Sequence, residues 1–272
     1  MANLNERIET FHQLHAAGCF VIPNPWDLGS ATLLVQLGFK ALATTSSGFA
    51  WSTGRRDKAV PLDDVLHHLR QVAAAVDVPV SADFEGGFAL AADGVAANVS
   101  RAAGTGIAGL SIEDSTGDPS APLIGFDLAV DRIRAARQAI DASGSRLVLT
   151  GRSEGFVAGR PDLRETIRRL IAYAEAGADC LHAPGLREMT DIEAVVKAVA
   201  PRPVNVLAGW PFTTLATLSA AGVRRVSVGG ALARVALTAL LDAAGEIARD
   251  GTFTALGRAL PGQDINSRFR PS

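Results

Sequence analysis

Short β-branched segments alternate with longer segments rich in Ala, Leu and Arg through most of the 272-residue chain. The longer segments have helical periodicity. In residues 62–76 the apolar side chains recur at the i, i+3, i+4, i+7 spacing of an amphipathic helix. The short segments end at intervals of roughly 29 residues, the length of one strand–helix unit. The eight predicted strands are residues 19–23, 41–46, 78–84, 109–114, 146–152, 180–184, 203–208 and 224–229.

Eight consecutive strand–helix units predict a (β/α)8 barrel. The strands are short and almost continuously apolar, which is typical of strands buried on both faces of a parallel sheet. A doubly wound open sheet is the alternative, but no G-x-G-x-x-G motif follows the first predicted strand. We expect one barrel domain over residues 1–272, in which residues 231–272 form a C-terminal helical extension.

The charge balance and the cysteine count exclude several classes of protein. Lys plus Arg number 26 and Asp plus Glu number 28, so no basic surface for nucleic acid or an anionic membrane is predicted. No apolar segment reaches the roughly 18 residues of a membrane span, and no signal peptide is recognisable. The two cysteines are too few for a disulfide framework or a zinc ribbon. We expect a cytoplasmic protein with neither nucleic-acid nor membrane partners.

Lysine is scarce in this chain. Lys40, Lys58 and Lys197 are the only three. An enzyme that forms a Schiff base needs a desolvated lysine beside the reacting carbon. None of the three lies in a predicted strand, and Lys58 belongs to a charged loop. The sequence therefore argues against lysine aldolase and pyridoxal-phosphate chemistry.

Acidic residues follow two neighbouring predicted strands, at the end where barrel enzymes carry their catalytic residues. Asp83 and Glu85 are two positions apart, so in an extended strand they point to the same face, and Glu113 ends the next strand. Three converging carboxylates repel one another unless a positive group lies between them. A hard divalent cation such as Mg²⁺, with oxygen ligands, meets that need. The alternative is a set of ion pairs with arginines and a solvated Glu85.

Arg152 ends the fifth predicted strand. A buried arginine needs a partner, which is either a substrate carboxylate or phosphonate or a protein acid such as Glu154 or Asp83. The polar residues after the second strand, Ser46, Ser47 and Gly48, can donate hydrogen bonds to the same ligand.

His182 is the only histidine near a predicted strand end. It is either a general acid/base or a core histidine with its hydrogen bonds satisfied. No HxH or HExxH motif occurs, which disfavours a zinc site built from histidines.

Several segments together resemble the isocitrate lyase/phosphoenolpyruvate mutase superfamily over about residues 10 to 250. The resemblance implies a (β/α)8 barrel whose last helix is exchanged between the subunits of a homo-oligomer, a dimer or a tetramer. It also implies Mg²⁺ (or Mn²⁺), small 2-oxo acids or their phosphonates as ligands, and C–C or C–P bond chemistry through an enolate-like intermediate. The matching segments are NPWDLGSATLLVQLGFKALATTSSG, LDDVLHHLRQV, VPVSADFEGGF, GIAGLSIEDS, VLTGRSE and YAEAGADCLHAPGL.

The same resemblance implies roles for individual residues. Asp83 and Glu113 match acids of the metal site, and Glu85 stands where most members have an aspartate. Asp57 matches a further acid near the metal. The candidate substrate-binding residues are Ser46, Ser47, Gly48, Asp27, Arg152 and Asn205, and the candidate catalytic residues are Arg152, Asp57 and His182.

One segment departs from the family pattern. Lyases of the family carry a Lys-x-Cys-Gly-His type loop after strand four, where this chain has STGDPSAPLIGF (115–126), without Lys, Cys or His. This argues against isocitrate lyase and methylisocitrate lyase activity, and the mutase-type loop with Lys and Asn is absent too. The metal, the arginine and the amide donors that stabilise an enolate remain.

We therefore expect a Mg²⁺-dependent lyase that cleaves a C–C bond in a small 2-oxo or 2-hydroxy carboxylate. One alternative is C–P bond chemistry, as in a phosphonopyruvate mutase or hydrolase. The other is a barrel that binds a metabolite without catalysis.

Overall fold

The computed structural model describes residues 2–269 and contains the predicted barrel. Eight parallel strands form one sheet in the order β1-β8-β7-β6-β5-β4-β3-β2. The Ala43 N–H donates to the Pro23 carbonyl at 3.1 Å, which joins the ends of the first two strands and closes the sheet. The strands are β1 (Phe20–Ile22), β2 (Leu42–Ala43), β3 (Val80–Asp83), β4 (Gly109–Glu113), β5 (Val148–Arg152), β6 (Cys180–His182), β7 (Val204–Leu207) and β8 (Arg225–Ser227).

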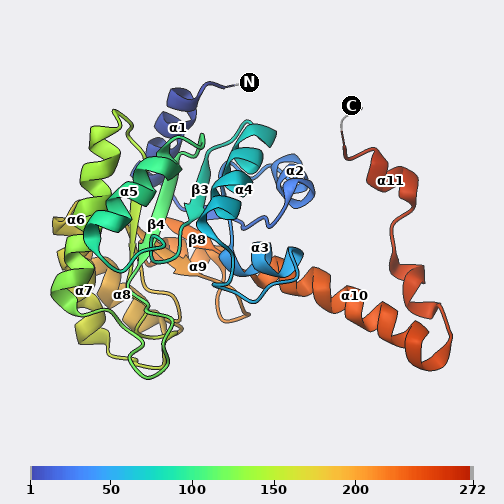
Figure 1. Ribbon diagram of the computed structural model, residues 1–272. Helices are drawn as coiled ribbons and strands as arrows, with labels where there is room; N and C mark the ends of the chain where they lie inside the picture. The colour runs from blue at the N-terminus through green and yellow to red at the C-terminus, as the bar shows by residue number, and fades with distance from the viewer. Residues whose placement is uncertain (1, 270–272) are drawn as a thin grey trace.

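Helices connect the strands and surround the sheet (Figure 1). The predicted amphipathic helix is α4, and its buried residues, among them Leu66, Leu69 and Val72, follow the helical spacing. The helices are α1 (Leu4–Ala16), α2 (Leu28–Gln36), α3 (Ser46–Ser52), α4 (Leu62–Ala75), α5 (Ala92–Ala103), α6 (Phe126–Ala142), α7 (Leu163–Glu175), α8 (Met189–Val199), α9 (Leu215–Ala220), α10 (Ala231–Asp250), the 3₁₀ helix η1 (Thr254–Arg258) and α11 (Gly262–Asn266).

Strand β2 is shorter than predicted. Residues 44–46 were expected to continue it, but the Thr45 side chain accepts a hydrogen bond from the Gly48 N–H and caps α3. Ser46 and Ser47 are therefore the first residues of α3, at the edge of the barrel mouth, and do not end a strand.

The interior of the barrel holds a buried arginine with neutral partners. Arg225 of β8 donates to Asn205 Oδ1 at 2.9 Å, to Thr150 Oγ1 at 3.0 Å and to His15 Nε2 at 3.2 Å. The other ring nitrogen of His15, Nδ1, donates to the Phe11 carbonyl at 2.7 Å. His15 must be neutral to accept from Arg225 while donating to Phe11. Burial, together with the charge of Arg225, lowers the pKa of His15 to about 3.

Acidification is expected to destabilise the protein through His15. The unfolded chain binds a proton near the ordinary histidine pKa, whereas the folded protein does so only near pH 3, so unfolding is favoured as the pH falls between these values. From pH 7 to pH 5, His15 alone should lower the free energy of unfolding by ~2 kcal/mol. Urea unfolding at both pH values should show a smaller difference for His15→Gln, while the exposed His67→Gln should match the unchanged protein. If the free energy of unfolding changes by the same amount between the two pH values in all three proteins, His15 is not the source of the pH dependence.

The C-terminal part leaves the barrel. Helix α10 projects away from it, and the following tail turns back until the Arg268 carbonyl accepts a hydrogen bond from Gln36 of α2 (Figure 1). Large apolar side chains of α10 are exposed, with Leu240 at 61% and Leu241 at 70%. Exchange of this helix between subunits, the dimer or tetramer, and the single-domain assignment of residues 1–272 stay predictions. No helix among residues 2–269 is both long enough and apolar enough to cross a membrane.

Candidate active site

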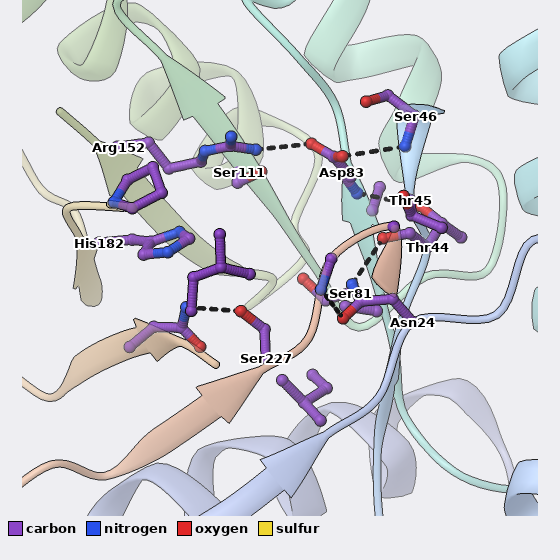
Figure 2. Close-up of a pocket in the computed structure, with 18 of the residues that line it drawn as sticks. Asn24, Thr44, Thr45, Ser46, Ser81, Asp83, Ser111, Arg152, His182 and Ser227 are labelled. Atoms are coloured by element: carbon purple, nitrogen blue, oxygen red, sulfur yellow. Dashed lines mark hydrogen bonds and ion pairs between the residues drawn. The ribbon is translucent and has the colours of Figure 1, made fainter. Parts of the chain in front are cut away.

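A cavity of about 200 Å³ lies at the carboxyl ends of the strands. Figure 2 shows Arg152 and His182 on one side of it and Ser46, Asp83 and Asn24 on the other. A cavity of this volume fits a small organic acid, whereas the pockets that bind nucleotide-sized ligands are larger. Of the predicted site residues, the cavity brings together Ser46, Ser47, Asp57, Asp83, Arg152, His182 and Asn205.

Arg152 forms the centre of a cluster of ion pairs. Its guanidinium lies 2.7 Å from Asp83 Oδ1, 3.1 Å from Glu113 Oε2 and 3.0 Å from Glu154 Oε1. Burial acts against the charge, but the three carboxylates outweigh it and raise the pKa of Arg152 well above its ordinary value. Arg152 therefore has protein acids as partners, which is one of the two arrangements expected from the sequence.

Asp83 is held from two sides at the end of β3. Its Oδ1 accepts from Arg152, and its Oδ2 accepts from the Ser46 backbone N–H at 2.9 Å. Asp57 also lines the cavity. Burial and the nearby charge of Asp83 raise the pKa of Asp57.

Glu85 does not share a strand face with Asp83. Strand β3 ends at Asp83, and Glu85 has φ 47°, so the alternation of an extended strand does not apply to it and that expectation is wrong. Glu85 and Asp83 instead border a small hollow that also contains His68. Burial, and then the charges of Asp83, Glu113 and Asp57, raise the pKa of Glu85 to about 8.

The loop that carries Glu85 is fixed by a buried arginine of α6. Arg132 donates to the backbone carbonyls of Gly86, Ala89 and Glu113, so one side chain ties the loop after β3 to the end of β4. The sequence analysis did not single out Arg132, because helical arginines usually lie at the surface.

Glu113 is bound by two cations. Its Oε2 faces Arg152, and its Oε1 accepts from Lys58 Nζ at 2.8 Å. Burial opposes the charge of Lys58, but the charge of Glu113 and the hydrogen bond to it raise the pKa of Lys58. The sequence analysis treated Lys58 as an ordinary loop lysine. Its position beside Asp57 was the only signal, since Glu113 is 55 positions away along the chain.

The acids fit a hydrated divalent cation better than one held directly by side chains. Among residues 2–269, no three His, Cys, Asp or Glu side chains converge closely enough to hold a metal ion. Burial first, and then the charges of Asp83, Glu113 and Asp57, disfavour the ionised form of Glu85, so a cation beside it would favour that form. Mg²⁺ usually keeps several waters and binds through one or two carboxylates. Asp83, Glu85 and Glu113 could hold such an ion after rearrangement of the pairs at Arg152 or Lys58.

His182 lies in the cavity wall and is not a satisfied core histidine. Its Nε2 is buried and has no hydrogen-bond partner among the described residues. Burial, and then the charges of Arg152 and Arg225, lower the pKa of His182 well below its ordinary value. A neutral ring with a free nitrogen can bond a ligand, but it is a weak base.

Asn24 and Asn205 organise the strand ends. Asn24 Oδ1 accepts from the backbone N–H groups of Val228 and Gly229, at 3.0 and 2.8 Å, which joins β1 to the end of β8. Asn205 Nδ2 donates to Ser227 Oγ at 2.9 Å, while its Oδ1 accepts from Arg225. Both polar atoms of Asn205 are therefore engaged inside the barrel.

Four predicted residues lie outside the cavity lining: Glu85 and Glu113, described above, and Asp27 and Gly48. Asp27 is exposed and caps α2, with its Oδ1 accepting from the Ser30 N–H at 2.7 Å. Gly48 is buried against Trp26, and a Cβ at this position would lie 2.9 Å from Trp26 Cβ. Nothing in the geometry brings Asp27 or Gly48 to a ligand in the cavity, and their assignments stay predictions.

Asp114 does not line the cavity but stabilises a residue that pairs with Arg152. Its Oδ1 accepts from the Glu154 N–H at 2.8 Å, and its Oδ2 accepts from Tyr173 at 2.6 Å and from Arg169 at 2.9 Å. This fully buried network positions the backbone of Glu154, which pairs with Arg152.

Residues 11–248 match the family model for phosphoenolpyruvate phosphomutase. The chain is 30% identical to the oxaloacetate decarboxylase of Paraburkholderia xenovorans, over 90% of this chain and 82% of the relative. A Burkholderia cenocepacia J2315 crystal structure, assigned only provisionally as a lyase/mutase, superposes with a TM-score of 0.93 and 49% identity, covering 97% of this chain and 95% of that one. A phosphonopyruvate hydrolase in complex with oxalate and Mg²⁺ has a TM-score of 0.82 and 26% identity, covering 96% and 94%.

Proposed function

The chain belongs to the isocitrate lyase/phosphoenolpyruvate mutase superfamily, and from that premise we propose that it is a Mg²⁺-dependent lyase. Its substrate is a small 2-oxo or 2-hydroxy carboxylate, and it cleaves the C–C bond next to the carbon that becomes enolate-like. One observation carries the proposal: Arg152 lines the cavity and is paired with three carboxylates, those of Asp83, Glu113 and Glu154.

Each group at the cavity has a distinct part in the proposed reaction. Arg152 is the planar donor for the substrate carboxylate. Ser46 lies across the cavity from it (Figure 2), and Ser47 also belongs to the lining. Asp83, Glu85 and Glu113 would hold a divalent cation, which when bound would supply positive charge opposite developing negative charge on the substrate oxygens. His182 offers its free ring nitrogen to a substrate oxygen. Mn²⁺ has the same ligand preferences and is expected to substitute for Mg²⁺.

The reaction class is tested by the products. The protein with Mg²⁺ is incubated with oxaloacetate, with substituted malates and with phosphonopyruvate. Release of pyruvate or another 2-oxo acid from the first two supports the proposal, whereas release of phosphate from phosphonopyruvate favours C–P chemistry. Tight oxalate binding without turnover of any compound favours a barrel that only binds a metabolite.

The metal site is tested separately, by Asp83→Ala. The variant is expected to lose Mn²⁺ binding, measured by electron paramagnetic resonance, together with oxalate binding, measured by calorimetry. The loss should exceed roughly tenfold in each case, because a charged metal ligand is removed. Asp77→Ala is the matched control, since Asp77 is exposed in the bend that precedes β3. Unchanged binding of Mn²⁺ and oxalate by Asp83→Ala would refute the metal site.

A further inference from the structure

Lys58 is a cation at the site that the proposed reaction does not use. It belongs to the loop between α3 and α4 (residues 53–61), where its backbone has φ 63°. Its Nζ donates to Glu113 Oε1 at 2.8 Å and to Ser115 Oγ at 2.9 Å. One side chain therefore joins this loop to the end of β4 and to the first residues of the loop between β4 and α6 (residues 114–125).

Both carboxylate oxygens of Glu113 already face a cation. Lys58 Nζ binds Oε1, and Arg152 Nη2 lies 3.1 Å from Oε2. The Glu113 side chain is only 5% exposed, so it has little surface left for a further partner. A divalent cation, or the waters around it, can approach Glu113 only where one of these two groups withdraws.

Lys58 is the group that can withdraw. Arg152 is 16% exposed and pairs with three acids. Lys58 is 40% exposed and pairs with Glu113 alone among the salt bridges of the described residues. Its flexible four-carbon stem lets the ammonium group return to solvent without movement of the barrel. The attraction that holds it is partly screened by water, unlike that of the buried Arg152.

We propose that Lys58 is an internal counter-ion of Glu113 and competes there with the divalent cation. This inference rests on the metal site of the proposed function. Its withdrawal also removes the bond to Ser115. Arg169 still donates to the Ile124 carbonyl, and the network of Asp114 is kept, so the two ends of the loop stay attached to the barrel. Between these ends, residues 115–123 keep internal hydrogen bonds such as the Thr116 N–H to the Pro122 carbonyl at 3.0 Å. Metal binding is thereby coupled to release of this segment beside the cavity.

Removal of the lysine charge is expected to tighten metal binding. Mn²⁺ titrations followed by electron paramagnetic resonance should give roughly tenfold tighter binding for Lys58→Met than for the unchanged protein, since one competing charge is gone. Lys58→Arg keeps the charge and should bind Mn²⁺ within about twofold of the unchanged protein. Equal or weaker binding by Lys58→Met would overturn the proposal.

Hydrogen exchange of the loop gives a second readout. Mn²⁺ added to the unchanged protein should speed amide exchange in residues 115–125, and Lys58→Met should show fast exchange without metal. Ser115→Ala loses the tie but keeps the competing charge, so it should exchange faster without any gain in Mn²⁺ affinity. A loop whose exchange does not respond to Mn²⁺ would refute the coupling.

The two proposals fail in different ways. Mn²⁺ binding that is identical in Lys58→Met and the unchanged protein, and lost in Asp83→Ala, leaves the metal site standing and refutes the role of Lys58. If neither the unchanged protein nor either variant binds Mn²⁺, the metal site and the role of Lys58 are both refuted.

Discussion

Arg152→Met is expected to lower turnover by roughly 10³-fold, the upper range for removal of one charged donor from an active site. Methionine fills a similar volume but cannot pair with Asp83, Glu113 and Glu154, and it has no donor for a substrate carboxylate. The measurement is kcat with the substrate that the product assay identifies, together with calorimetric binding of oxalate.

Two further variants make the Arg152 result specific. Arg152→Lys keeps the charge but loses the planar fork, so turnover should still fall by roughly 10²-fold. Arg164→Met changes an exposed arginine of α7 and should leave turnover unaltered. Circular dichroism spectra that match the unchanged protein would show that Arg152→Met is folded. Near-normal turnover by folded Arg152→Met would exclude Arg152 as the substrate-binding cation.

Asp114→Ala is expected to lower the free energy of unfolding by about 3–5 kcal/mol, the usual cost of breaking one side of a buried ion pair. The change leaves the buried Arg169 with the more exposed Glu165 as its remaining carboxylate partner, and it removes the acceptors of the Tyr173 hydroxyl and the Glu154 N–H. Urea unfolding followed by fluorescence measures the loss, with Asp77→Ala as the exposed control.

A double substitution distinguishes the loss of the Asp114–Arg169 ion pair from other destabilising effects of replacing Asp114. Arg169→Met added to Asp114→Ala should cost less than the sum of the two single changes, because the unpaired charge is gone. Tyr173→Phe alone should cost only about 1 kcal/mol, the value of one hydrogen bond. A loss below about 1 kcal/mol for Asp114→Ala would show that the network does not stabilise the fold.

Much of the candidate site follows from the rule that strand ends of a barrel meet at one mouth. Asp83, Arg152 and His182 were selected because each lies near the end of a predicted strand, and Asn205 was assigned from the family resemblance; all four line the cavity. That rule needs only the strand positions, which the apolar pattern supplies. It failed at Glu85, because the backbone turns immediately after Asp83.

Other parts of the site depend on contacts between residues far apart along the chain. Lys58 meets Glu113 across 55 positions, and Asp114 meets Tyr173 across 59. The periodicity of apolar residues does not predict such pairs, because it shows which face of a helix or strand is buried and not which residue that face contacts.

The sequence by itself determined the eight-fold alternation, the barrel and several of the residues at its mouth, among them Asp83, Arg152 and His182, because burial of each strand and of one face of each helix imposes a repeating apolar pattern. The tertiary structure alone decided how the charges pair. Arg152 pairs with three acids, and Lys58 pairs with the Glu113 oxygen that Arg152 does not face. The pKa of Glu85 is raised to about 8. Electrostatic energy depends on distance and on burial, and both are properties of the folded chain.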